Sequence, residues 1–535
     1  MWYNLLMKET MKNVLNNAEM VLISRAEYDA LRIQNELLTE QLRLLNKKVF
    51  GASSEKTSQQ SQDCMDGQMT FPFNEAEVCA DAAKAEPEKT TVAAHTRKKH
   101  VGGLEENLPD DLPVEIVDHR LNKDQISCPE CGAEMVEIGK EIRRSLVIIP
   151  AKKMIREDHF YTYACKRCEQ ENIKTPIRKT TKTAPVIPGS YASPEAIAHI
   201  MVQKYVMGSP LYRQEQELNR SGVMLSRQTM SNWILRAAED WLKPIYEQLH
   251  RDLLQRQVLH ADETTLQVLR EPGKAAQSKS YMWLYRTGSD AEHPIVLYEY
   301  KDSRRAENAK AFLKGFSGYL HADGYAGYHK LQPEIAVVGC WAHARRKFDE
   351  ALNAVPVKER STSMALKGLE FCNHLFSVEK RLENLPHEER YEQRLSQAKP
   401  VLDALWRWTR TIAAVPKSSL GKALHYLEEQ WPYLCRYLED GRLEISNNRA
   451  ERSIKPFVTD RKNFLFSNTP GGAQGSAVIF SLIETAKESG LDPFRYLTYV
   501  LTEAPALASV GEDWVAKLMP ANAPTECRVP VQRKH

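Results

Sequence analysis

The stretch Val258-Leu259-His260-Ala261-Asp262 decides how this chain is organised, and Gly318-Tyr319-Leu320-His321-Ala322-Asp323 repeats its design. Both stretches contain Leu-His-Ala-Asp, an apolar run that ends on a carboxylate. A buried strand that stops on an Asp places a charge at the edge where open α/β sheets hold their ligands. Two such strands side by side would bring Asp262 and Asp323 within reach of a divalent cation. The alternative is that both aspartates cap strands at ordinary turns.

The pattern around these stretches predicts a mixed sheet. Strands are expected at residues 280–287, 294–300 and 335–339, with a helix at 304–316. Three consecutive strands can pair as antiparallel hairpins, and the helix then supplies a right-handed crossover to a parallel fourth strand. If the first and fourth strands are neighbours, Asp262 and Asp323 meet, which is the ribonuclease-H-like arrangement.

A third carboxylate follows much later in the chain. Asn447, Asn448 and Glu451 share one face of a helix that we expect Pro456 to end. Mg2+ prefers oxygen ligands, so Asp262, Asp323 and Glu451 suit it, and two ions about 4 Å apart would serve an in-line displacement at phosphorus. Glu263 and Glu444 are rival acids, but Glu263 follows Asp262 in a strand and therefore points to the other face. Beyond Pro456 we expect a short strand at 464–466 and a loop at 471–475.

Basic and imidazole side chains lie near these acids in the sequence. His343 is expected to contact the scissile phosphate or donate a proton, although a lone histidine is more often structural. Contacts with the DNA backbone are expected from four basic residues: Arg345, Arg346, Arg452 and Lys455.

Composition limits the class of protein. The chain has 535 residues, too many for one core, and its charges nearly balance, with 73 Lys and Arg against 70 Asp and Glu. No apolar run reaches membrane-spanning length, and the N-terminus lacks a signal-peptide pattern. The ten cysteines form two tight pairs plus single residues, which is metal-ligand usage in a reducing compartment and not a disulfide framework.

The two cysteine pairs predict a zinc module. Cys128 and Cys131 form one Cys-x-x-Cys, and Cys165 and Cys168 form the other. Two such pairs complete the tetrahedral shell of a structural Zn2+, and the basic flank at 152–182 is typical of a nucleic-acid contact. A redox-active pair is the alternative.

A heptad pattern precedes this module. Tyr28, Asn35, Leu42 and Val49 take one seam position, and Leu31, Leu38 and Leu45 take the other. This spacing predicts a coiled coil that joins at least two chains, with Asn35 fixing the register. An ordinary amphipathic helix packed on the body of the protein is the alternative.

A helix-turn-helix pattern follows the zinc module in the sequence. Helices are expected at 211–220 and 226–238, joined by Ser221-Gly222-Val223. The second helix would turn Met230, Trp233 and Ile234 inward. Its polar face would offer side chains to a DNA groove: Arg227, Gln228, Ser231 and Asn232. A plain helical hairpin is the alternative.

With these motifs in hand, the chain resembles transposases of the insertion sequence 66 family over nearly its whole length. The motifs that carry the resemblance are Leu259-His260-Ala261-Asp262-Glu263-Thr264, His321-Ala322-Asp323-Gly324-Tyr325, Cys340-Trp341-Ala342-His343-Ala344-Arg345-Arg346 and Asn447-Asn448-Arg449-Ala450-Glu451-Arg452. The resemblance implies a catalytic Asp-Asp-Glu triad, matched here by Asp262, Asp323 and Glu451. It also implies binding of the element's terminal inverted repeats, Mg2+-dependent cleavage and strand transfer, bacterial origin, and accessory proteins encoded by the same element.

The expected organisation is a multidomain α+β chain acting in the bacterial cytoplasm at the nucleoid, as a homodimer or higher oligomer. Its parts are a coiled coil at 21–50, a linker at 51–110, a zinc-binding domain at 111–183, a helical DNA-binding region at 190–250, a ribonuclease-H-like core at 255–350 and 441–490, an α-helical insertion at 351–440, and a C-terminal helix and tail at 491–535. A nuclease that cuts without joining and a multimeric zinc-dependent DNA-binding regulator are the alternatives.

The cysteine spacing generates the first prediction. Changing Cys128→Ser removes one of four zinc ligands, so the protein should lose Zn2+ and bind the element's ends more weakly. Atomic absorption on the purified variant measures the metal. Full retention of zinc would refute the assigned role of Cys128.

Overall fold

The computed structural model describes residues 153–159, 184–511 and 513–530, the backbone of two short strands at 162–164 and 177–179, and isolated positions between Ser24 and Leu38. The chain divides into two compact units, one containing 1–53 and 183–529 and the other containing 54–182 and 530–535. Each unit is described by itself. The cysteines Cys128, Cys131, Cys165 and Cys168 lie outside the described residues.

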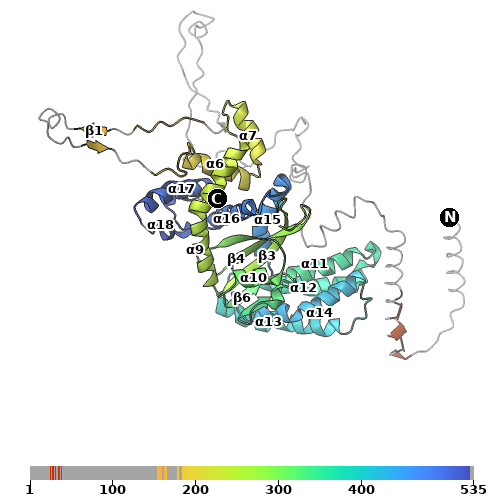
Figure 1. Ribbon diagram of the computed structural model, residues 1–535. Helices are drawn as coiled ribbons and strands as arrows, with labels where there is room; N and C mark the ends of the chain where they lie inside the picture. Colours follow the sequence, from red (N-terminus) through yellow and green to blue (C-terminus); the bar gives the residue numbers. More distant parts are fainter. Residues whose placement is uncertain are drawn as a thin grey trace, which may run out of the picture. The chain divides into compact units, whose positions relative to one another are not determined.

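A five-stranded sheet forms the centre of the larger unit (Figure 1). Its strands, in the spatial order β5-β4-β3-β6-β7, are β5 (Val296–Lys301), β4 (Lys279–Thr287), β3 (Val258–Gln267), β6 (Gly318–His321) and β7 (Ile335–Val338). The first three strands along the chain pair antiparallel, whereas β6 joins β3 in parallel and β7 joins β6 in parallel. Helix α10 (Ala306–Phe312) makes the crossover between β5 and β6.

The expectation that β3 ends at Asp262 is wrong. The strand continues to Gln267, because β4 stays paired with it through the register Gln267↔Lys279. Only the parallel neighbour β6 stops early, at His321. Asp262 therefore lies in mid-strand, just beyond the point where its parallel partner leaves the sheet.

Successive side chains along a strand point to opposite faces of the sheet, and different helices cover these two faces. On β4, Arg286 reaches Ser453 of α15 (Asn448–Phe464) and Glu488 of α16 (Pro470–Glu488). The alternate position Tyr285 faces the other way and stacks on Phe312 of α10, with ring centroids 3.9 Å apart. One face is thus covered by α15 and α16, and the opposite face is covered by α10.

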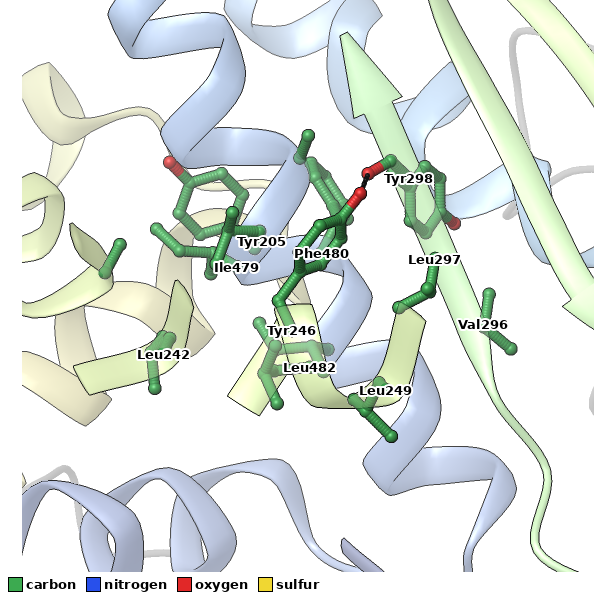
Figure 2. Packing of buried hydrophobic residues seen from close by; sticks show 14 of the residues in the cluster. Tyr205, Leu242, Tyr246, Leu249, Val296, Leu297, Tyr298, Ile479, Phe480 and Leu482 are labelled. Atoms are coloured by element: carbon green, nitrogen blue, oxygen red, sulfur yellow. Dashed lines mark hydrogen bonds between the residues drawn. The ribbon is translucent and has the colours of Figure 1, made fainter. Parts of the chain in front are cut away.

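The core beneath α16 is continuous with the helices that precede the sheet. Figure 2 shows Phe480 of α16 between Tyr205 and Tyr298, with ring-centroid distances of 5.0 and 5.6 Å. Tyr246 of α9 (Lys243–Leu254) donates a hydrogen bond of 3.0 Å to the carbonyl of Tyr298 on β5. Helices far apart in the sequence therefore share one core with the sheet.

Helix α15 corrects two expectations. Pro456 does not end it, because the helix runs on to Phe464 with Ile454, Phe457 and Val458 buried. Burial of that face outweighs the one backbone hydrogen bond that proline removes. Residues 464–466 accordingly form no strand, and Leu465 instead terminates the helix with φ +67°.

The expected loop at 471–475 is also wrong, because this glycine-rich segment is the start of α16. Thr469 caps the helix by accepting a hydrogen bond from the N–H of Gly472. Gly475 has a packing reason: a Cβ there would lie 2.5 Å from Leu235 of α8.

The helical region before the sheet contains α6 (Pro194–Tyr205), α7 (Leu211–Arg220) and α8 (Arg227–Ala237). Gly222 makes the turn between α7 and α8 with φ +81°. We expected this second helix to end at residue 238. It instead continues from α8 through a π-helical turn, Ala238–Leu242, into α9. As expected, Met230, Trp233 and Ile234 are buried.

Four helices separate β7 from α15. They are α11 (Trp341–Asn353), α12 (Met364–Leu382), α13 (His387–Thr409) and α14 (Ser419–Leu434), gathered as one group in Figure 1. They have their own hydrophobic core. Arg394 of α13, only 1% exposed, pairs with Glu379 and donates to the carbonyls of Tyr437, Asp440 and Leu443. This buried guanidinium fastens the group to the segment that leads into α15.

The C-terminal part contains α17 (Pro493–Ser509) and α18 (Trp514–Lys517), and α17 packs against α6. No helix among the described residues is both long and apolar enough to span a membrane. The described heptad positions Tyr28, Leu31 and Leu38 are helical and more than half exposed. The coiled coil itself stays a prediction.

In the smaller unit, β1 (Thr162–Ala164) and β2 (Ile177–Lys179) pair antiparallel, with Thr162 opposite Lys179.

Glu299 of β5 yields a pH-dependent prediction. Burial raises the pKa of this carboxyl to about 7 against the opposing effect of Lys301, and its Oε2 has no hydrogen-bond partner. Because the folded state holds the proton more tightly than the unfolded state, stability falls as pH rises from about 4.5 to about 7. Changing Glu299→Gln should remove that slope and stabilise the protein at pH 8 by about 1–3 kcal/mol.

Urea unfolding of both proteins between pH 5 and pH 8 measures the difference. The gain should be absent at pH 5, where the glutamate is still protonated. An equal difference at both ends of the pH range would contradict the assignment.

Candidate functional site at the β3–β6 junction

The parallel register of β3 and β6 brings the two Leu-His-Ala-Asp stretches side by side. His260 pairs with His321, and their imidazole rings stack with centroids 4.4 Å apart. Asp262 and Asp323 each lie two residues beyond this pair. Asp262 is opposite Leu284 in the antiparallel register, so its side chain is on the sheet face that α15 covers.

Asp262 is surrounded by negative charge. Burial, together with the charges of Glu263, Asp323 and Glu451, raises the pKa of the Asp262 carboxyl well above its ordinary value. A divalent cation would relieve this repulsion, and the donor set of carboxylate oxygens is the one that Mg2+ prefers.

Glu263 is enclosed by partners on the opposite face of the sheet. Arg304 donates from Nε to its Oε1 at 2.6 Å, and the Tyr328 hydroxyl donates to its Oε2. Burial and Asp323 raise the pKa of Glu263 to about 7 in spite of these partners. The Arg304 guanidinium also lies 3.8 Å from Asp323, so it contacts both Glu263 and Asp323.

Glu451 is in the first turn of α15, but it faces two basic groups. Its Oε1 lies 3.7 Å from Nδ1 of His343, and its Oε2 lies 3.6 Å from Arg346. Among the described residues, the group of side chains close enough to share a metal ion is Cys340, His343 and Glu451. The three acids do not form such a group in this conformation.

His343 is placed next to the acids by α11. Burial disfavours its cationic form, but Cys340, Glu451 and Asp323 favour it and together raise the pKa of His343 to about 9. Without a bound metal ion, the imidazole is therefore cationic at neutral pH. Among the expected roles, a contact to an anionic phosphate and proton donation both need this form.

Asn447 connects three segments of the site, whereas its place in the sequence indicated only that it shares a helix face with Glu451. Its Oδ1 lies 3.0 Å from Nδ1 of His260, its Nδ2 donates to the Ala261 carbonyl at 2.8 Å, and its backbone N–H donates to Sγ of Cys340. Burial lowers the pKa of His260 to about 3, so the ring is neutral and donates to Asn447. The residue type alone gave no signal of this role, since Asn at a helix start usually caps the helix.

The expected DNA-contacting residues lie in two places. On α8, Arg227, Gln228 and Asn232 are exposed and Ser231 is half-buried, so these side chains lie on the outer face of the helix. Nearer the acids, Arg345 is exposed on α11 and bonds Asn373, while Arg346 contacts Glu451. Arg452 is exposed and Lys455 half-buried on α15.

The contacts of Asn447 predict a specific loss of stability. Asn447→Ala leaves His260 and the Ala261 carbonyl buried without partners, and should destabilise the fold by about 2–4 kcal/mol. Since the Asn447 side chain makes no capping hydrogen bond to α15, loss of a cap does not contribute. Chemical denaturation measures the change.

Asn448→Ala, at the next and half-buried position, is the matched control and should change stability by less than about 0.5 kcal/mol. Equal effects at the two positions would refute the connecting role of Asn447.

Four family profiles match this chain in separate segments. The profile described as Transposase IS66 family covers 189–475, the zinc-finger binding domain of transposase IS66 covers 125–169, Transposase C of IS166 homeodomain covers 37–117, and the IS66 C-terminal element covers 481–520. The first includes the sheet and all three expected acids. The second includes all four cysteines of the two Cys-x-x-Cys pairs.

Similar proteins occur in Sinorhizobium fredii. The chain is 29% identical to the uncharacterized protein y4qI over 92% of this chain and 89% of the relative. It is 31% identical to the uncharacterized protein y4jD over 74% of this chain and 77% of the relative. With the main family profile covering more than half of the residues, these matches show that the chain belongs to the IS66 transposase family and carries its zinc-finger domain.

Proposed function

We propose that this protein binds the terminal inverted repeats of its insertion sequence and catalyses metal-dependent DNA cleavage and strand transfer through Asp262, Asp323 and Glu451. The observation that supports the proposal is the β3–β6 register, in which His260 pairs with His321, so that Asp262 in β3 and Asp323 just beyond the end of β6 each follow this pair by two residues. Helix α15, packed against β3, brings Glu451 to the same face.

The strand order supports a ribonuclease-H-like core. Three antiparallel strands followed by two parallel strands, in the order β5-β4-β3-β6-β7, is the arrangement expected for that fold. The helices α11–α14 enter between β7 and α15, at the point where an insertion leaves the sheet intact. The carboxylates lie at the parallel junction, where open sheets bind their ligands.

The mechanism we propose assigns distinct tasks to the chain's own groups. Asp262, Asp323 and Glu451 would hold two Mg2+ ions, which supply charge neutralisation at the phosphodiester and activation of the attacking hydroxyl. Because Glu451 faces His343, its side chain has to turn toward Asp262 to join that set. His343, cationic at neutral pH, would then be free to contact the scissile phosphate.

The basic groups would orient DNA. Four basic residues would neutralise backbone phosphates from α11 and α15, the helices that carry His343 and Glu451: Arg345, Arg346, Arg452 and Lys455. The exposed face of α8, with Arg227, Gln228, Ser231 and Asn232, would bind a groove of the element's end. The zinc-finger domain and a multimer formed by the heptad segment would add further contacts. A protein of this kind acts at the bacterial nucleoid, together with accessory proteins of the same element.

Replacing any one of the three acids tests the proposal. Asp262→Asn, Asp323→Asn and Glu451→Gln each remove one carboxylate and should abolish strand joining, by at least about 100-fold, while end binding stays within about 2-fold. The measurement is an incubation of protein, Mg2+ and labelled element ends with a plasmid, followed by detection of covalent joints. Glu428→Gln, an exposed acid on α14, is the matched control and should join normally.

Three outcomes separate the candidate activities. Joining that survives in an acid variant would refute the assignment of that acid. Cut ends without joints, in the unaltered protein, would indicate a nuclease. Unchanged behaviour of Asp262→Asn in every assay would indicate a DNA-binding regulator.

A further inference from the structure

Three side chains of different chemistry converge beside the acid pair. Cys340 is the residue before α11, His343 lies in the first turn of α11, and Glu451 lies in the first turn of α15. One ligand atom from each residue, a sulfur, a ring nitrogen and a carboxylate oxygen, lies within 4.8 Å of the other two. A cysteine sulfur and a histidine nitrogen are both ordinary ligands of Zn2+, and a carboxylate oxygen can complete the set.

Two of these ligand atoms are buried without a hydrogen bond. Nδ1 of His343 and Oε1 of Glu451 have no hydrogen-bond partner, although they face each other at 3.7 Å. Buried polar atoms nearly always have a hydrogen-bond partner, so each of these two atoms needs an explanation, and a role as a metal ligand is one. Cys340 is fully buried with a free thiol.

The sulfur of Cys340 is held in place by a hydrogen bond from the start of α15. The backbone N–H of Asn447 donates to its Sγ at 3.2 Å. The same hydrogen bond fixes the sulfur relative to α15. Two separate helices thus hold the three donor groups around one point.

The donor set selects the class of ion. Thiolate and imidazole ligands favour Zn2+ and related borderline-soft cations such as Co2+ and Cd2+, whereas Mg2+ takes oxygen ligands. Three protein ligands also leave a fourth tetrahedral position open, as at zinc sites that bind a water or substrate.

We propose that Cys340, His343 and Glu451 form a second zinc-class site, separate from the zinc finger. An ion there holds Glu451 and His343 in the arrangement that the structure shows. If Glu451 also serves the proposed Mg2+ set, the two sites compete for it, and zinc inhibits strand joining. That consequence rests on the proposed function, whereas binding of the ion does not.

The test is the number of zinc ions bound by the full chain. Protein stripped with a chelator is dialysed against Zn2+ under reducing conditions, and bound metal is measured by plasma mass spectrometry. The unaltered protein should hold two ions per chain, Cys340→Ser should hold one, and Cys435→Ser, a half-buried cysteine outside the cluster, should hold two. Equal zinc in the unaltered protein and Cys340→Ser would overturn the proposal.

Glu451→Gln is the second variant, in case Cys340→Ser fails to fold, because its side chain is partly exposed. It should weaken binding of the second ion by at least about 10-fold, and circular dichroism checks its fold. Unchanged affinity would overturn the proposal.

A joining assay at fixed Mg2+ with added Zn2+ follows. Loss of joining as the second ion binds supports the competition, and undiminished joining with both zinc ions bound overturns it. Absence of joining even without added zinc would instead count against the proposed function and leave the measured stoichiometry standing.

Discussion

The side chain of Asn447 makes the interaction on which the candidate site depends. It joins β3, through His260 and the Ala261 carbonyl, to the start of α15, and its backbone joins α15 to Cys340 before α11. These three segments are separated by long stretches of sequence that include the whole α11–α14 group. Arg286 of β4 also reaches Ser453 further along α15, and Asn447 adds the connection at the start of the helix, over the middle of β3.

Acidic side chains that lie close together repel one another, and the fold offsets this repulsion in a different way for each acid. Asp262 takes a raised pKa, and Glu263 is matched by Arg304 and Tyr328 on the opposite face. Glu451 is directed to His343 and Arg346. Each of these acids except Asp262 thus has a cationic neighbour, and Asp262 lies where a bound cation would be most favoured.

The sequence predicted most of the sheet and the parallel pairing of the two Leu-His-Ala-Asp strands, because the repeated pattern indicates both the strands and their register. It did not predict where elements end. Pro456 and the glycines from Gly471 to Gly475 have local preferences for helix ends and loops, which tertiary burial overrides. The Cys340–His343–Glu451 group was also missed, although Cys-x-x-His was visible, because its third member is more than a hundred residues away.

The π-helical turn at Ala238–Leu242 joins α8 and α9 into one unbroken rod from Arg227 to Leu254. Within α9, the Tyr246 hydroxyl donates a hydrogen bond to the Tyr298 carbonyl of β5, and the other half of the helix carries the exposed polar face of α8. A DNA duplex bound to that face could not rotate independently of the sheet. The distance along the duplex from the α8 contact to the reacting bond would then be fixed, and the length of this continuous helix would set it.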